Sequence, residues 1–201
     1  MTLLNPFVDG PAYDRVKGKP HMKLSQIFSA LALAASVVLA AKNPMVGGKE
    51  MYPTKNIIEN AVNSANHTTL VAAVKAAGLV ETLEGPGPFT VFAPPNTAFA
   101  KLPAGTVDTL LKPENKDTLT KILTYHVVAG RIGAVELKKM IKDGHGKAEL
   151  KTVSGGKLWA MMQGSMIVLK DEKGGMSTVT QANVFQSNGV IHVVDSVLLP
   201  N

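Results

Sequence analysis

Cysteine is absent from the 201 residues of the chain. The sequence therefore offers no disulfide framework, no thiolate metal site and no cysteine nucleophile. Aromatic residues are scarce at 5%, which is too few for the stacking surfaces that bind single-stranded nucleic acid. Charged residues make up only 18% and apolar residues 45%, a composition typical of globular proteins and not of disordered chains. We therefore expect a folded protein that has no nucleic acid partner.

The net charge is moderately positive, because 21 lysines and arginines face 15 aspartates and glutamates. Such an excess permits contact with anionic surfaces. Lys138, Lys139 and Lys142 fall within one predicted helix and form a candidate contact for a polyanion, either an acidic polysaccharide or a lipid head group. The alternative is a solvated helix face, since Glu136 and Asp143 are interspersed and cancel part of the field.

Residues 22–40 have the layout of a secretory signal. A short basic start at Lys23 leads into an apolar stretch, and Val38 and Ala40 stand at the −3 and −1 positions of a cleavage site. The apolar stretch of about 15 residues is shorter than the roughly 20 that a spanning helix needs. We expect cleavage and a secreted or periplasmic protein. The alternatives are an uncleaved anchor, which alone would tie the protein to a membrane, and a buried core helix.

The remaining N-terminal residues divide into two parts. Residues 1–21 show no sustained apolar period and are either a vector-derived leader or the product of a wrongly assigned start, with Met22 as the better start. Residues 41–55 contain Pro44, Gly47, Gly48 and Pro53 and are predicted to be a flexible tether. The folded domain then covers residues 56–200.

Helical patterns dominate the first part of this domain and strand patterns dominate its last third. Helices are expected over residues 57–62, 69–77, 79–83, 96–99, 106–111, 117–125 and 134–142. Strands are expected over residues 89–92, 150–153, 158–162, 166–169, 178–185 and 190–199. The pair Asn188-Gly189 predicts a hairpin turn with positive φ at both residues. Helices followed by strands indicate an α+β fold and not a parallel α/β sheet.

Three segments together resemble the fasciclin-type domain family: residues 90–99 (TVFAPPNTAF), 123–130 (LTYHVVAG) and 188–200 (NGVIHVVDSVLLP). Their order and separations fit the family, and the resemblance covers residues 56–200. Pro95 and Asn56 depart from the family's usual Thr and Asp, although Asn caps a helix as Asp does. The resemblance implies a compact β-wedge packed with several helices. It also implies an extracytoplasmic adhesion role, in a single-domain member of the small bacterial kind.

Six residues of these family-like segments are expected to have structural roles: Phe92, Pro94, Asn96, Phe99, His192 and Asp195. We expect Pro94 to end a strand, Asn96 to satisfy free N–H groups of the short helix that follows it, and Phe92 and Phe99 to reach the core on either side. Alternation places His192 and Asp195 on opposite faces of the last strand. Both faces are mainly apolar, so this strand is predicted to be buried on both sides.

The sequence predicts neither an enzyme nor a cofactor or metal site. A serine hydrolase needs Ser, His and Asp in contact, whereas His192 and Asp195 point to opposite faces, and no Gly-x-Ser-x-Gly elbow occurs. His67, His126 and His145 also lack the spacing of metal ligands.

Tyr125 and His126 form the candidate partner contact that the family resemblance implies. The alternative is that both side chains fix a helix-to-strand junction, with the rings buried and their polar atoms hydrogen-bonded. Two functions are therefore open. One is a monomeric, non-catalytic adhesion or interaction module that binds a cell-surface protein or polysaccharide. The other is a soluble carrier of a small apolar or anionic ligand held between wedge and helices.

Overall fold

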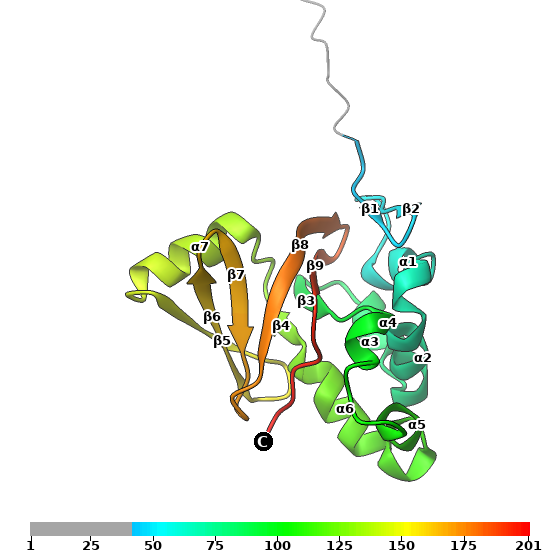
Figure 1. The fold of residues 1–201 in the computed structure, drawn as a ribbon. Coiled ribbons are helices and arrows are strands. Elements are labelled where there is room, and N and C mark those ends of the chain that lie inside the picture. Colours follow the sequence, from blue (N-terminus) through cyan, green and yellow to red (C-terminus); the bar gives the residue numbers. More distant parts are fainter. Residues whose placement is uncertain (1–41) are drawn as a thin grey trace, which may run out of the picture. The chain divides into compact units, whose positions relative to one another are not determined.

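The computed structural model of the chain describes residues 42–201 (Figure 1). The predicted leader (1–21) and signal segment (22–40) lie outside the described residues. Among residues 42–201, no helix combines the length and the apolar character needed to cross a membrane.

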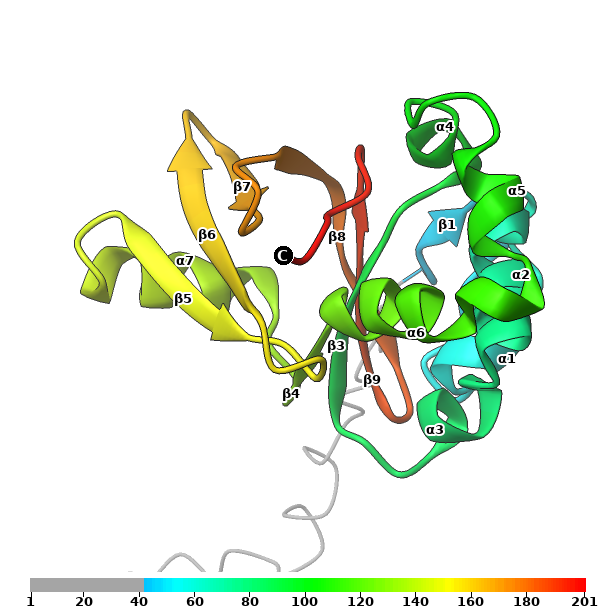
Figure 2. The ribbon, with the colours of Figure 1, turned by 90° about the horizontal axis from the view of Figure 1, so that it is seen from below.

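The helices fall on two sides of one β-sheet. Helices α1 to α5 gather beyond strands β3 and β9, whereas α7 covers β5 and β6 at the other end (Figures 1 and 2). Their bounds are α1 Ile57–Ala61, α2 Thr68–Ala77, α3 Val80–Glu84, α4 Asn96–Phe99, α5 Thr106–Leu110, α6 Lys116–Tyr125 and α7 Ala134–Asp143. Two 3₁₀ turns, Ala65–His67 and Pro113–Asn115, lead into α2 and α6.

Seven strands form a single curved sheet in the order β4-β3-β9-β8-β7-β6-β5. The bounds are β3 Phe89–Ala93, β4 Val127–Ala129, β5 Lys147–Lys151, β6 Lys157–Gln163, β7 Met166–Lys170, β8 Met176–Gln186 and β9 Gly189–Val194. β3 and β9 pair in parallel, and the other neighbours are antiparallel. An isolated bridge between Val128 and Thr152 brings the two edges together, so the sheet is a near-barrel. The predicted α+β fold is confirmed.

Strands β3 and β9 divide the core in two. Val91 and Ile191 belong to a cluster shared with α1, α2 and α3, whereas Phe92 and Val194 belong to a cluster enclosed by α7 and β5–β7. All six residues of β9 are buried, which confirms the prediction that this strand is covered on both faces. The strand ends at Val194, however, and not at residue 199 as its apolar pattern predicted.

Residues 42–55 are not the flexible tether that the sequence predicted. They form a small hairpin of β1 (Met45–Val46) and β2 (Lys49–Glu50), and the side chains of Val46 and Met51 are buried in the first core cluster. Tyr52, which follows Met51, is held by the side-chain amide of the buried Asn60. This amide accepts a hydrogen bond from the N–H of Tyr52 at 2.9 Å and donates one to the carbonyl of Tyr52 at 2.8 Å. Glycine and proline mark turns in hairpins as well as in linkers, so composition alone misled the prediction.

Helix capping was predicted correctly only where it is local. Asn56 caps α1 in a capping box with Glu59, as expected. Asn96 does not cap its own helix α4: its Oδ1 instead accepts a hydrogen bond from the N–H of Thr69, 3.0 Å away at the start of α2. Likewise, the N–H of Ala134 at the start of α7 donates to Oδ1 of Asn183 at 2.8 Å. Side chains distant in the sequence therefore set where α2 and α7 begin.

Candidate functional sites

Tyr125, at the end of α6, is completely buried. Its hydroxyl donates a hydrogen bond to the carbonyl of Lys157 at 2.6 Å and accepts one from the N–H of Glu172 at 3.1 Å. Burial raises the pKa of Tyr125 to about 12, and the nearby carboxylates of Glu172 and Asp171 act in the same direction. The side chain thus joins α6 to the two ends of the β6–β7 hairpin.

His126, the next residue, is also enclosed in the core, with 3% of its surface exposed. Its Nδ1 donates to the carbonyl of Ile122 at 2.9 Å, and its Nε2 accepts from the N–H of Leu198 at 3.0 Å. Burial lowers the pKa of His126 to about 4, so the ring is neutral at neutral pH. Tyr125 and His126 therefore offer no surface to a partner in this structure. The structure therefore favours the alternative interpretation, in which the helix-to-strand junction encloses both rings.

The other signature residues lie in the core or at the end of a strand. The rings of Phe92 and His192 stack with centroids 5.7 Å apart, and Nε2 of His192 donates to the carbonyl of Ile132 at 2.9 Å. Pro94 is buried at the end of β3, and Phe99 is buried in the first core cluster. These positions match the structural interpretation of the segment.

Asp195 follows β9 and binds the neighbouring strand β8. Its Oδ1 accepts hydrogen bonds from the N–H of Thr178 at 2.8 Å and from Oγ of Ser177 at 3.2 Å. Partial burial would raise the pKa of Asp195, but these hydrogen bonds and the ammonium group of Lys101 outweigh it and lower the pKa. Asp195 has no bond to His192, so the pair does not form a catalytic relay. Within residues 42–201, no three potential metal-ligating side chains come together either.

The basic helix α7 exposes Lys138, Lys139 and Lys142, while Leu137 and Ile141 are buried beneath it. The described ion pairs, Lys101–Asp195 and Lys157–Glu149, include none of these three lysines. Charge is also unevenly spread along residues 42–201, which hold 17 basic and 13 acidic residues. Residues 131–173 alone hold nine basic and five acidic residues, so they account for the whole surplus of four.

A surface groove lies next to this helix, between the two edges of the sheet. Its volume is about 410 Å³, and it is lined from α7 by Met140, from the β4 edge by Val128 and from the β5 edge by Lys151. The groove and the exposed lysines of α7 thus occupy the same end of the sheet.

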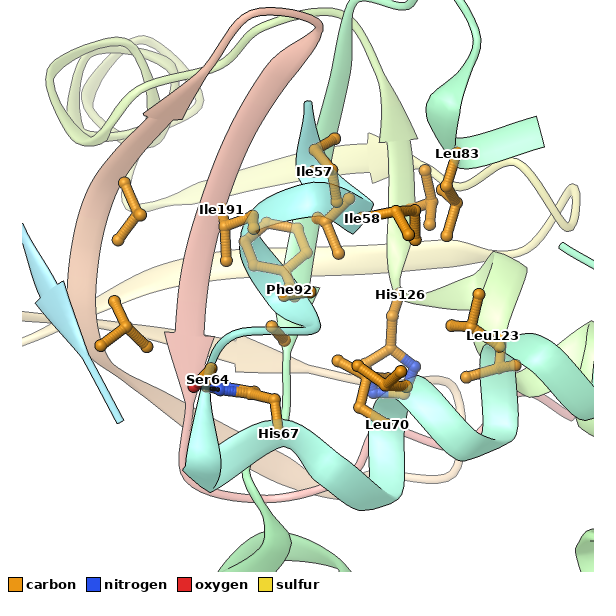
Figure 3. Close-up of a pocket in the computed structure, with 18 of the residues that line it drawn as sticks. Ile57, Ile58, Ser64, His67, Leu70, Leu83, Phe92, Leu123, His126 and Ile191 are labelled. Atoms are coloured by element: carbon orange, nitrogen blue, oxygen red, sulfur yellow. Dashed lines mark hydrogen bonds between the residues drawn. The ribbon is translucent and has the colours of Figure 1, made fainter. Parts of the chain in front are cut away.

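An internal cavity of about 50 Å³ lies between helices α1–α3 and strands β3, β4 and β9 (Figure 3). Its walls are almost wholly apolar and include Ile58, Leu70, Leu83 and Ile191. No local pattern in the sequence indicates this cavity, because the lining side chains come from segments that only the fold brings together.

The polar side chains at this cavity are Ser64, His67 and His126, together with Lys75 at the surface. Oγ of Ser64 lies 2.8 Å from Nδ1 of His67, and the dashed line in Figure 3 marks this bond. Nε2 of His67 has no hydrogen-bond partner among residues 42–201. Burial lowers the pKa of His67, and the carbonyl of Ala93 lies near enough to the ring to oppose this shift without hydrogen-bonding geometry.

Comparison with known proteins agrees with the resemblance seen in the sequence. The Fasciclin domain family matches residues 65–200. Protein sll1483 of Synechocystis is 45% identical over 166 residues, which cover 83% of this chain and 85% of that protein. The cell surface glycolipoprotein MPB83 of Mycobacterium bovis is 35% identical over 167 residues, which cover 80% of this chain and 68% of that protein.

Among solved structures, a FAS1 domain pair from the insect cell adhesion molecule fasciclin I aligns with a TM-score of 0.46 and 22% identity. The alignment covers 70% of this chain and 43% of that one. The match of the family to residues 65–200, together with the identity and coverage of the Synechocystis relative, shows that the chain belongs to the fasciclin domain family.

Proposed function

We propose that this protein is a non-catalytic extracytoplasmic module that attaches to an acidic polysaccharide of a cell surface through the exposed lysines of α7. The observation that carries the proposal is the concentration of the surplus positive charge in residues 131–173. The relative MPB83 is named a cell surface glycolipoprotein, which supports a location outside the cytoplasm.

Physical reasons favour a polymeric anion over a small one. Lys138 and Lys142 are one helical turn apart and share a face, while Lys139 is rotated by about 100°. Three ammonium groups spread over this surface match repeated carboxylates better than one compact anion.

Binding to immobilised alginate, measured across a salt series, tests the proposal. The screening length falls from about 10 Å at 0.1 M to about 3 Å at 1 M, so retention should weaken steeply with salt. Changing Lys138, Lys139 and Lys142 together to Gln should weaken binding about tenfold or more at low salt and flatten the salt dependence.

A matched control removes the same charge elsewhere. Lys49, Lys112 and Lys116 are exposed and lie outside residues 131–173. Their triple change to Gln should leave most of the binding intact. Equal loss in both variants would mean that total charge and not the α7 surface governs binding, and unchanged binding in the α7 variant would leave those lysines as a solvated face. Retention by vesicles of phosphatidylglycerol but not by alginate would assign the surface to lipid instead.

Export is part of the same proposal. Val38 and Ala40 precede the described domain at signal-cleavage spacing, so the mature protein should begin at Ala41 or Lys42. N-terminal sequencing of material from the cell exterior checks this. A chain that begins at Met22 and sediments with membranes would instead be an anchored protein.

The second candidate, a carrier of a small ligand, is favoured by the apolar cavity between helices and sheet. Native mass spectrometry of protein purified from its source checks it. A co-purifying small molecule supports a carrier, and a bare protein that still binds polysaccharide supports attachment alone.

A further inference from the structure

One residue that lines the internal cavity, His67, carries a buried polar atom without a hydrogen-bond partner. The ring of His67 is 4% exposed, and its Nδ1 is occupied by Ser64. Nε2 of this ring is the buried side-chain polar atom that lacks a hydrogen-bond partner in the described part of the chain. A buried polar group without a partner destabilises the folded protein, so the protein gains stability if a bound molecule supplies that partner.

Water is a poor occupant of this space. A cavity needs roughly 10–15 Å³ to hold one water molecule, so about 50 Å³ is large enough for several. A buried water, however, usually makes about three hydrogen bonds. Both ring nitrogens of His126 are already bonded, to Ile122 and Leu198, which leaves Ser64 and His67 as the polar partners. Apolar cavities of this kind stay dry and accept apolar molecules.

The cavity also has an entrance. Most lining residues are buried, but Ala61, Val71 and Val80 are half-buried, and Lys75 is exposed. Val71 and Lys75, one turn apart on α2, line the cavity together with Ala61 at the end of α1 and Val80 at the start of α3. A small molecule can therefore enter between these three helices without unfolding the sheet. Lys75 is the charged residue of the lining, and it stands at the surface.

We propose that the cavity binds a small neutral molecule that has a compact apolar body and one hydroxyl or carbonyl oxygen, and that this oxygen hydrogen-bonds to Nε2 of His67. The proposal gives a ligand class to the carrier function suggested above and rests on that function, but it is independent of polysaccharide attachment. The neutral ring of His67 can donate or accept this bond, depending on which nitrogen carries the proton, so both alcohols and ketones fit.

Titration with straight-chain 1-alkanols, from propanol to octanol, tests the proposal by protein-detected NMR. Each CH₂ group that enters an apolar space adds about 0.8 kcal/mol, or about fourfold in affinity, until the cavity is full. Backbone signals of Ile58, Leu70 and Ile191 should shift, and the Nε2 signal of His67 should move with alcohols. The corresponding 1-chloroalkanes should shift the same backbone signals but leave Nε2 unchanged.

A variant tests the polar anchor separately from the apolar walls. The ratio of alcohol affinity to chloroalkane affinity should fall about fivefold in His67→Leu, which corresponds to one ordinary hydrogen bond. Val71→Phe, which narrows the entrance, should weaken both ligand classes equally and keep the ratio. If His67→Leu does not fold, the Nε2 signal of the wild-type protein still decides the matter.

Two results would overturn the proposal. One is the absence of saturable shifts at the cavity residues with any alcohol; the other is an alcohol-to-chloroalkane ratio that does not depend on His67. The carrier function fails differently, because protein from its source would then carry no small molecule even though the alkanol titration succeeds.

Discussion

Nε2 of His126 accepts a hydrogen bond from the backbone N–H of Leu198 across 3.0 Å, although 72 residues separate them in the chain. On the other side of the ring, Nδ1 donates to the carbonyl of Ile122 one helical turn earlier. The imidazole thus ties the end of α6 to the segment after β9. An imidazole bonded at both nitrogens within the core has a structural task, which accounts for its place in the family signature without any contact to a partner.

Replacing this imidazole should cost stability. His126→Ala removes both hydrogen bonds and strands the buried N–H of Leu198, so we expect a loss of about 1–3 kcal/mol in the free energy of unfolding. Denaturant unfolding measures it, and binding to alginate should fall only in proportion to the folded fraction. His145→Asn is the control, since His145 is exposed and has a φ of 55°, which Asn tolerates. A His126→Ala protein that unfolds like the wild type but no longer binds would make His126 a contact residue after all.

Acid should weaken the fold before the carboxylates are protonated. Burial lowers the pKa of His126 from 6.5 to about 4, and burial also lowers the pKa of His67 and of His192. These rings take up protons at higher pH in the unfolded chain than in the folded protein, so low pH favours unfolding. Stability should be full above about pH 6.5 and fall as the pH drops toward 4, with ~3 kcal/mol of that loss due to His126.

Denaturant unfolding at several pH values between 7.5 and 4 checks this expectation. The loss should be smaller in a His126→Gln protein, because that variant no longer has this ring to protonate. A free energy of unfolding that stays level or rises toward pH 4 would contradict it.

The elements of the fold could be predicted from the sequence because their patterns are local. Apolar spacing predicted each α-helix and six of the seven sheet strands, all except the short β4, although β9 ends five residues before its predicted end. The β8–β9 hairpin was also predicted, but its turn lies one residue earlier, at Ser187 and Asn188, and the positive φ expected at Asn188 and Gly189 was wrong. Gly189 is required for another reason: a Cβ atom there would lie 2.2 Å from the carbonyl oxygen of Phe89 on β3. That requirement depends on a parallel neighbour strand that no local pattern reveals.

The candidate sites were harder to predict, because each site depends on which distant segments of the chain pack against its residues. Alternation predicted that β9 is buried on both faces, but nothing in the sequence showed that Tyr125 and His126 are enclosed by the β6–β7 hairpin and the C-terminal segment. The exposure of the α7 lysines followed from helical spacing, whereas the charge surplus of residues 131–173 gains meaning only because these residues form one end of the sheet. The cavity beside His67 had no local signal at all.

The distant caps make a prediction of their own. Asn96→Ala should destabilise the protein by ~1 kcal/mol, because the N–H of Thr69 at the start of α2 loses its acceptor. Asn183→Ala should cost more than this, since it removes the cap of α7 and also places alanine at a φ of 62°. Asn66→Ala is the control: Asn66 is exposed, and its side chain forms no hydrogen bond within residues 42–201. Thermal and denaturant unfolding measure all three, and an Asn96 variant as stable as the control would show that the long-range cap is unimportant.

The glycine pair of the β1–β2 turn tests whether residues 42–55 are docked on the domain. Gly47 and Gly48 both have positive φ, +60° and +77°, so alanine at either position costs about 1–2 kcal/mol of backbone strain if the hairpin stays formed. A Cβ atom at Gly47 would also lie 2.4 Å from Oγ of Ser64 and 2.8 Å from the backbone nitrogen of Asn66, whereas one at Gly48 would meet nothing within 4 Å. Gly47→Ala should therefore lower the free energy of unfolding by about 1–3 kcal/mol more than Gly48→Ala, the usual cost of overpacking. In a free tether the chain would simply shift, and both substitutions would be neutral. If neither substitution changes the free energy of unfolding in denaturant, residues 42–55 are a linker. If Gly47→Ala lowers it much more than Gly48→Ala, these residues belong to the folded domain.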